Sequence, residues 1–211
     1  MHGRSLPPAG RDLFDEFALA LAGWDWDLAL LQEVPPWWPA LLAARLPADS
    51  RSVRTSRNAL PALQRAVAVR WPDVIKASGG GANAILARAP QRIVEHRRLR
   101  LRLVPERRML HAVRLARGCW VGNLHATVHN ERAALAEAAR AARTMLGWAG
   151  GEPLVLGGDF NVRGLVLPGL SRVGSEDVDY LFAAGLRAGG SCDVLARGRL
   201  SDHAPIAATF A

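Results

Sequence analysis

The sequence contains few cysteines, few lysines and no long apolar run. Its two cysteines, Cys119 and Cys192, have neither the spacing of a metal site nor that of a redox pair, so we expect both to be reduced and structural. No apolar segment approaches the roughly 20 residues that a membrane-spanning helix requires. The N-terminal residues also lack the continuous apolar region of a secretory signal. These absences predict a cytoplasmic protein without a membrane span.

Lysine is almost absent although the chain is basic. Of the 27 basic residues only Lys76 is a lysine, and the net charge is +8 at pH 7. Arginine binds phosphate groups well because its planar guanidinium offers several donors. An arginine excess together with abundant alanine is also what GC-rich codon usage produces. The charge therefore permits a phosphate-bearing substrate without selecting one.

Length and composition are those of a globular domain. The 211 residues are 50% hydrophobic and 22% charged, which is enough for one large core. No linker-like segment and no repeat divides the chain. We therefore expect one domain over residues 1–211, acting as a monomer without a protein partner.

Leu154–Val162 is the most informative stretch. A short apolar run, bounded by glycine, predicts a buried strand that ends in Asp159 and Asn161. Gly157 and Gly158 leave room for a ligand or another backbone to approach closely. In an extended segment Asp159 and Asn161 would point to the same face, where a carboxylate and a carboxamide can take a proton from water and orient it. An ordinary turn is the alternative interpretation, because these residue types are common in turns.

The rest of the chain shows alternating helical and strand periodicity. Helices are predicted over Asp12–Leu21, Trp37–Leu46, Leu60–Arg70 and Asn130–Trp148. Strands are predicted over Trp26–Val34, Ala82–Arg88, Arg92–Leu103, Met109–Leu115, Trp120–His125, Val178–Phe182 and Ala204–Phe210. The order favours an α/β sandwich with mixed sheets. The arginines within Arg92–Leu103 are explained more simply by a solvated strand face than by a dedicated groove.

Further polar groups stand at the ends of these apolar segments. They are Gln32-Glu33, Asn123-Leu124-His125, Asp179 and Ser201-Asp202-His203-Ala204-Pro205. Each could be a simple turn, but together they supply carboxylates suited to a hard cation and histidines suited to phosphate. The sequence shows no serine or cysteine nucleophile in an elbow and no cysteine–histidine set for zinc.

The ordered set of motifs resembles the endonuclease/exonuclease/phosphatase superfamily, which includes deoxyribonuclease I, apurinic endonucleases, sphingomyelinases and inositol phosphatases. The matching pieces are Leu-Gln-Glu-Val at 31–34, Asn-Leu-His at 123–125, Gly-Gly-Asp-Phe-Asn at 157–161, Val-Asp-Tyr-Leu-Phe at 178–182 and Ser-Asp-His-Ala-Pro at 201–205. The resemblance implies a four-layered α/β sandwich, in which helices flank two packed mixed sheets. It also implies Mg²⁺- or Mn²⁺-dependent hydrolysis of a phosphoester.

The resemblance also implies roles for residues around the metal and the water. Glu33 matches the family's principal metal-binding glutamate, and Asp202 matches the acidic residue that completes the metal site. Asp159 matches the aspartate that positions or deprotonates the attacking water. Asn161 matches its orienting partner.

The phosphate contacts are carried over in the same way. His203 matches the histidine that faces the phosphate, and Asp179 the residue that holds its other ring nitrogen. His125 matches a phosphate-contacting histidine, and we expect Asn123 to help bind the substrate. Together with Glu33, Asp202 and the Asp159–Asn161 pair, these side chains should converge on one cleft at the strand ends.

The start of the chain departs from the family. Members begin with a strand that ends in a metal-binding asparagine, whereas Met1–Arg4 resembles the segment just after it. We therefore expect that strand to be missing and Leu28–Leu31, which is apolar on both faces, to lie beside a vacant strand position. Pro7, Pro8 and Gly10 prevent the segment before Asp12 from replacing it. A chain extended upstream should then melt higher and bind metal more tightly.

The sequence thus predicts a phosphodiesterase or nuclease that uses Mg²⁺ or Mn²⁺. DNA or RNA, a phospholipid head group and a small phosphate ester remain open as substrates. The short chain without a lipid anchor favours nucleic acid or a small soluble phosphodiester. The alternative is a catalytically weak protein that binds a phosphate ligand on the same scaffold, a hypothesis that rests on the missing first strand.

Overall fold

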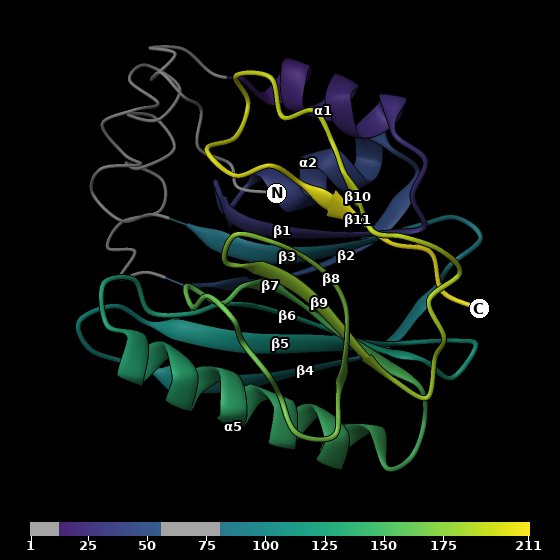
Figure 1. The fold of residues 1–211 in the computed structure, drawn as a ribbon. Coiled ribbons are helices and arrows are strands. Elements are labelled where there is room, and N and C mark those ends of the chain that lie inside the picture. The colour runs from purple at the N-terminus through teal and green to yellow at the C-terminus, as the bar shows by residue number, and fades with distance from the viewer. Residues whose placement is uncertain (1–12, 56–80) are drawn as a thin grey trace. The chain divides into compact units, whose positions relative to one another are not determined.

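The computed structural model describes residues 13–55 and 81–211, which divide into two compact units (Figure 1). Unit 1 comprises the described residues up to Arg92 together with Arg197–His203. Unit 2 comprises Ile93–Ala196 and Ala204–Ala211. The predicted helix Leu60–Arg70 and the segment before Asp12 lie outside the described residues, so the expectations about them remain predictions.

The described residues of unit 1 form a small sheet and two helices. Its elements are α1 (Phe14–Gly23), β1 (Leu28–Val34), α2 (Trp38–Arg45), β2 (Ala48–Arg54) and β3 (Ala82–Arg88). The described strands are ordered β1-β3-β2, and both pairings are antiparallel. The expectation of a vacant position beside β1 concerns residues outside this description.

The core of unit 1 follows from the helical spacing of its aromatic residues. Phe17 and Leu21 lie one turn apart on α1 and are buried together with Trp38 and Leu42 of α2. The ring centroids of Phe17 and Trp38 are 5.2 Å apart. These side chains pack against the apolar face of the sheet, to which Leu31 belongs. The pattern read from the sequence therefore produces the expected helix–sheet packing.

Unit 2 is built on a six-stranded sheet. Its elements are β4 (Ile93–Arg102), β5 (Arg108–Leu115), β6 (Trp120–His125), α5 (Glu131–Ala149), β7 (Leu154–Asp159), β8 (Ser171–Glu176), β9 (Asp179–Ala184), β10 (Asp193–Val194) and β11 (Ile206–Ala207). The large sheet has the order β4-β5-β6-β7-β9-β8, and β10 pairs with β11. Among the described strands of the large sheet, only β6 and β7 run parallel, and α5 connects them as a crossover.

Helix α5 covers one face of this sheet, as Figure 1 shows. Its N-cap is Asn130, whose side-chain oxygen accepts a hydrogen bond from the backbone N–H of Ala133 at 3.0 Å. It ends at Gly150, which has the left-handed φ of 57° that favours glycine. A stripe of alanines with Met145 faces the sheet. The predicted helix Asn130–Trp148 is therefore confirmed within one or two residues at each end.

Strand register separates the residues of unit 2 into two faces. Residues paired across neighbouring strands share a face, and Leu110, Leu124 and Phe182 belong to the face that packs against α5. His111 follows Leu110 on β5, and Asn123 precedes Leu124 on β6. These two residues pair with each other and therefore occupy the opposite face. The buried polar residues His111, Asn123, His125 and Asp159 therefore lie on the side of the sheet that does not contact α5.

Three described strands were not predicted: the two-residue β10 and the longer β2 and β8. Both β2, with the sequence Ala-Asp-Ser-Arg-Ser-Val-Arg, and β8, with Ser-Arg-Val-Gly-Ser-Glu, are polar and stand at one end of their described sheets. Such strands bury little side chain, so their sequences carry weak alternation. The predicted strand Ala204–Phe210 is shorter, since only Ile206–Ala207 forms β11. The α/β fold class is nevertheless confirmed, and no helix within the described ranges is long and apolar enough to span a membrane.

Candidate active site

Three predicted residues lie side by side at one edge of the six-stranded sheet. His125 ends β6, Asp159 ends β7 and Asp179 begins β9. Register pairs His125 with Asp159 and Asp159 with Asp179. Because β6 and β7 are parallel and β9 is antiparallel to them, the topology itself aligns these side chains in one row. Two carboxylates placed opposite one another repel, so this row favours a nearby positive charge.

Asp159 is held by both of its carboxylate oxygens. Oδ1 accepts a hydrogen bond from the backbone N–H of Asn161 at 2.9 Å, which forms a turn of the Asx type. Oδ2 lies 3.4 Å from Nε2 of His125, and both side chains are 2% exposed. The sequence offered no acidic partner for His125, since residues 125 and 159 are brought together only by the parallel pairing. A protonated His125 would therefore form a buried ion pair with Asp159.

Gly158 permits this close arrangement. Its φ is +134°, and a Cβ at this position would lie 2.0 Å from the carbonyl oxygen of Leu124 on β6. A side chain would thus force β6 and β7 apart just before the pair of His125 and Asp159. The prediction that glycine here allows another backbone to approach closely is confirmed for Gly158.

The extended geometry expected through Asn161 is wrong. Strand β7 ends at Asp159, and Asn161 has a left-handed φ of 52°, which asparagine tolerates better than most residues. The side-chain Nδ2 of Asn161 donates a hydrogen bond to the carbonyl of Ala126 at 3.1 Å. The backbone N–H of Ala126 in turn donates to the carbonyl of Asp159 at 2.8 Å. The stretch is therefore a turn, and the turn is what places Asn161 beside the end of β6.

Asn123 lies on the same face of the sheet, two residues before His125 on β6. Its cross-strand neighbour is His111, which the sequence did not indicate as a site residue. Asn123 is fully buried on β6 and pairs across the sheet with His111 on β5. Burial, and secondarily the charge of nearby His96, lower the pKa of His111 to about 3. Neither ring nitrogen of His111 has a hydrogen-bond partner among the described residues. A histidine within the apolar alternation of Met109–Leu115 was the available signal.

In unit 1, Glu33 occupies a distorted strand end. Its φ is +54°, and the pairing of β1 with β3 shifts register between Leu31 and Val34. Gly81 packs on this bend, because a Cβ there would lie 3.3 Å from the Cα of Glu33. Strain of this kind is concentrated at functional positions. The half-buried Glu33 side chain is thus presented by a bulge that an ideal strand would not provide.

Asp202 and His203 belong to the C-terminal segment of unit 1. Ser201 is fully buried, and its hydroxyl accepts a hydrogen bond from the backbone N–H of His203 at 3.2 Å. Arg197 donates to the backbone carbonyl of Asp202. Leu200 packs against the core of unit 1. These contacts fold the segment into a compact turn that carries two half-buried functional candidates.

The predicted site residues are therefore divided between the units. Unit 2 brings together Asn123, His125, Asp159, Asn161 and Asp179 at and near one sheet edge. Unit 1 contains the remaining candidates, which are Glu33, Asp202 and His203. Convergence of all of them in one cleft, and the hydrogen bond between Asp179 and His203, remain predictions.

The residues expected to hold a cation have the right donor type. Glu33 and Asp202 both offer carboxylate oxygens, the ligands that Mg²⁺ and Mn²⁺ prefer. Among the described residues, no three His, Cys, Asp or Glu side chains gather in a group that could hold a metal ion. Zinc is held by three or four such side chains, whereas Mg²⁺ keeps several waters and uses one or two carboxylates. The donor set therefore fits a hydrated hard cation.

Comparison with known proteins identifies the family of the chain. The sequence profile of the Endonuclease/Exonuclease/phosphatase family matches residues 4–203. The chain belongs to this family. No curated protein matches the sequence significantly. Family membership supports a hydrolase of the phosphoesterase type.

Solved structures of the Endonuclease/Exonuclease/phosphatase fold resemble the chain over almost its whole length. A mannosyl-6-phosphatase of Bacteroides thetaiotaomicron has a TM-score of 0.69 at 16% identity, covering 94% of this chain and 90% of that one. A family protein of Beutenbergia cavernae has a TM-score of 0.70 at 18% identity, covering 99% and 68%. TDP2 of Caenorhabditis elegans has a TM-score of 0.67 at 16% identity, covering 93% and 68%. At these identities the likeness establishes the shared fold.

Proposed function

We propose that the protein is a divalent-metal-dependent phosphodiesterase of the Endonuclease/Exonuclease/phosphatase family. The observation that carries the proposal is the row of His125, Asp159 and Asp179, with Asn161 tied to it by the Asx turn. A carboxylate held beside a carboxamide is suited to accept a proton from an attacking water and to orient that water. In this proposal Asp159 is the base and Asn161 the orienting group.

Hydrogen-bond donors stabilise the negative charge on the phosphate. His125, which lies against Asp159, contacts a phosphoryl oxygen, and Asn123 contributes to substrate binding from the buried part of β6. His203 donates to the phosphate in the transition state, and Asp179 keeps its imidazole charged and oriented. The roles of His203 and Asp179 rest on the family pattern and on the presence of the expected residue types.

Glu33 and Asp202 would hold the cation, Mg²⁺ or Mn²⁺. When bound, the cation supplies positive charge that stabilises the phosphoryl oxygens during hydrolysis. The bend at Glu33 supports this assignment, since a left-handed glutamate at a strand end is costly and is retained where its direction matters.

A nucleic acid or a small soluble phosphodiester is the proposed substrate. Two exposed arginines of β4, Arg98 and Arg100, support a polyanionic substrate. Arg98 pairs in register with His111, which pairs with Asn123, so this arginine lies on the site-bearing face of the sheet. Neither arginine has an ion-pair partner among the residues described, whereas Arg97 on the other face is bound to Glu95 at 2.6 Å.

The decisive experiment is a substrate panel with and without metal. We expect the protein to hydrolyse bis(4-nitrophenyl) phosphate and a labelled oligonucleotide in Mg²⁺ or Mn²⁺, and to lose turnover in EDTA. Vesicles containing sphingomyelin and the monoester 4-nitrophenyl phosphate are the comparison substrates. Preferential cleavage of either comparison substrate would overturn the proposed substrate class while leaving the hydrolase assignment intact.

The matched control is Asp159→Asn, which should bind the same oligonucleotide without cleaving it. If the native chain also bound the oligonucleotide but showed no metal-dependent turnover above that of Asp159→Asn, the phosphodiesterase proposal would be wrong. The protein would then be a binding protein on this scaffold.

A further inference from the structure

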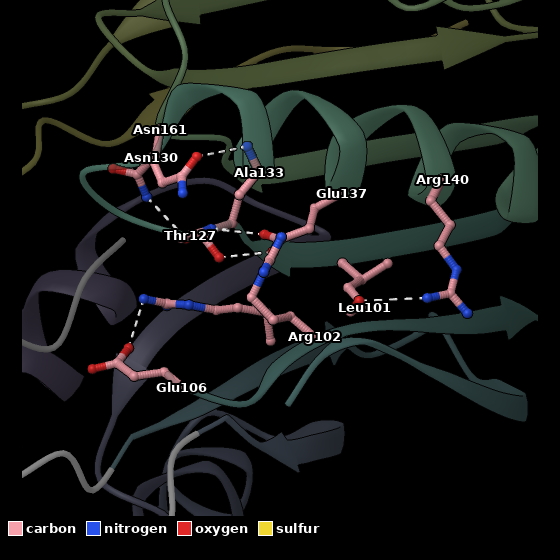
Figure 2. Close-up of polar contacts among 11 residues, drawn as sticks. Leu101, Arg102, Glu106, Thr127, Asn130, Ala133, Glu137, Arg140 and Asn161 are labelled. Atoms are coloured by element: carbon pink, nitrogen blue, oxygen red, sulfur yellow. Dashed lines mark hydrogen bonds and ion pairs between the residues drawn. The ribbon is translucent and has the colours of Figure 1, made fainter. Parts of the chain in front are cut away.

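The peptide unit between Ala126 and Thr127 is held from both sides. Its carbonyl oxygen, on Ala126, accepts the hydrogen bond from Nδ2 of Asn161 at 3.1 Å. Its N–H, on Thr127, donates to Oε2 of Glu137 at 2.8 Å. One rigid, planar group therefore lies between a candidate site residue and a helix residue. Figure 2 shows Asn161 and Glu137 approaching this segment from opposite sides.

Glu137 is unusual for a helical glutamate because it is only 2% exposed. Besides the Thr127 N–H, it accepts a hydrogen bond from the Thr127 hydroxyl, 2.7 Å from Oε1. Arg102 on β4 donates its Nε to the same oxygen (Figure 2). A buried carboxylate requires this degree of compensation, since an unpaired charge would be expelled or neutralised. The side chain therefore has one arrangement, and that arrangement fixes Thr127.

We propose that Glu137 is a positioning residue for the active site. It acts through the Ala126–Thr127 peptide to hold the carboxamide of Asn161 in place. This inference rests on the proposed function, in which Asn161 orients the attacking water. Neither Glu137 nor Thr127 is part of the motifs by which the family was recognised in the sequence.

The direction of the effect follows from the geometry. Without an acceptor at Glu137, the Thr127 N–H seeks another partner, and the peptide plane rotates. The carbonyl oxygen of Ala126 then no longer aligns with the Nδ2–H of Asn161, and the carboxamide becomes more mobile. A misplacement of about 1 Å at an orienting group costs up to about 100-fold in turnover. Substrate binding, which depends on other groups, should change much less.

The test is a double-mutant cycle on kcat with bis(4-nitrophenyl) phosphate. Glu137→Leu, which keeps the approximate volume and removes both acceptors, should lower kcat at least tenfold and leave KM within about twofold. In an Asn161→Ala background the same change should lower kcat less than about twofold, because the group that it positions is gone. Glu137→Gln retains an oxygen for the Thr127 N–H and should keep kcat within about threefold of the native value.

Two controls separate positioning from stability. Asn130→Ala removes the N-cap of α5 and should lower the melting temperature without lowering kcat. Arg140→Gln removes the hydrogen bond from the next turn of α5 to the carbonyl of Leu101 and should leave kcat unchanged. If Glu137→Leu does not fold, Thr127→Val, which lacks only the hydroxyl contact, provides a milder cycle with Asn161→Ala.

An equal loss of kcat in both backgrounds would overturn the proposal, since Glu137 would then act independently of Asn161. Solvent exchange of the Asn161 side-chain amide, measured by NMR on ¹⁵N-labelled protein, provides a readout that needs no activity. We expect faster exchange in Glu137→Leu than in the native chain. Unchanged exchange would refute the positioning role, whereas an inactive native chain with the expected exchange difference would refute the proposed function alone.

Discussion

Asp159 owes its environment to two contacts of different kinds. One carboxylate oxygen is held by the local turn through the N–H of Asn161, and the other faces His125 across the parallel strand pair. A base that is held in this way needs little reorganisation before it accepts a proton. The residue is therefore specified partly by its own sequence neighbours and partly by the sheet.

Asp159→Asn separates chemistry from structure. An asparagine oxygen can still accept the N–H of Asn161, so we expect a melting temperature close to that of the native chain. An amide cannot accept the proton of a water, and kcat should fall at least about 100-fold. Kinetics with bis(4-nitrophenyl) phosphate and a thermal melt check both halves. Turnover within tenfold of the native value would exclude Asp159 as the base.

Glu33→Ala and His203→Ala should differ in metal affinity. Removing the Glu33 carboxylate deletes an oxygen ligand, so calorimetric titration with Mn²⁺ should show at least about tenfold weaker binding. His203→Ala should leave the metal affinity unchanged and depress turnover, because its imidazole acts on the phosphate. An unchanged Mn²⁺ affinity in Glu33→Ala would rule out the metal-binding role.

Among the elements, β4 carries arginines in two different settings. Arg97 pairs with Glu95 and lies 4.8 Å from the ring centroid of Trp120, and Arg102 binds Glu137. Arg98 and Arg100 are exposed on the face that bears the candidate site. A single strand thus uses some arginines for structure, and in the proposed function it offers the others to an anionic substrate. The sequence pattern favours a solvated strand face for these arginines as a group. It does not separate the structural arginines from the exposed ones.

We expect the double variant Arg98→Gln, Arg100→Gln to lower kcat/KM for an oligonucleotide about tenfold or more at low salt. It should affect bis(4-nitrophenyl) phosphate less than about twofold, because only a long polyanion reaches β4. The salt dependence of oligonucleotide binding should become shallower. Arg97→Gln, on the other face of the same strand, is the control. Equal losses for both substrates would exclude a role in polyanion binding.

Across the whole molecule, the buried polar face of the large sheet makes stability depend on pH. The folded state lowers the pKa of His111 to about 3, whereas an unfolded chain would have an ordinary value near 6.5. Between these values only the unfolded chain binds the proton. The folded state therefore has its full stability above about pH 6.5 and loses stability as the pH falls toward 3.

His111→Leu should remove this dependence. The native chain should lose up to about 1.4 kcal/mol of unfolding free energy per pH unit below 6.5 through this residue. Urea unfolding of both proteins from pH 7.5 to pH 5 measures it, since the difference between the two curves isolates His111 from the other titrating groups. Parallel curves for His111→Leu would contradict the prediction.

The sequence by itself was sufficient for the family, the α/β class and most of the elements. Buried strands such as β7 and long amphipathic helices such as α5 carry strong periodic patterns, because core packing demands apolar residues at fixed intervals. The polar strands β2 and β8 were not predicted because they bury few side chains. Pairing with neighbouring strands, rather than their own residue pattern, makes them strands.

Only the tertiary structure decided which polar residues meet. The contact of His125 with Asp159 follows from parallel strand register, and the link from Glu137 to Asn161 follows from the packing of α5 on the sheet. Such contacts join residues distant in sequence, and no local pattern encodes the register that brings them together. Residue type at a strand end therefore indicated the candidates, whereas strand register and helix packing determined their partners.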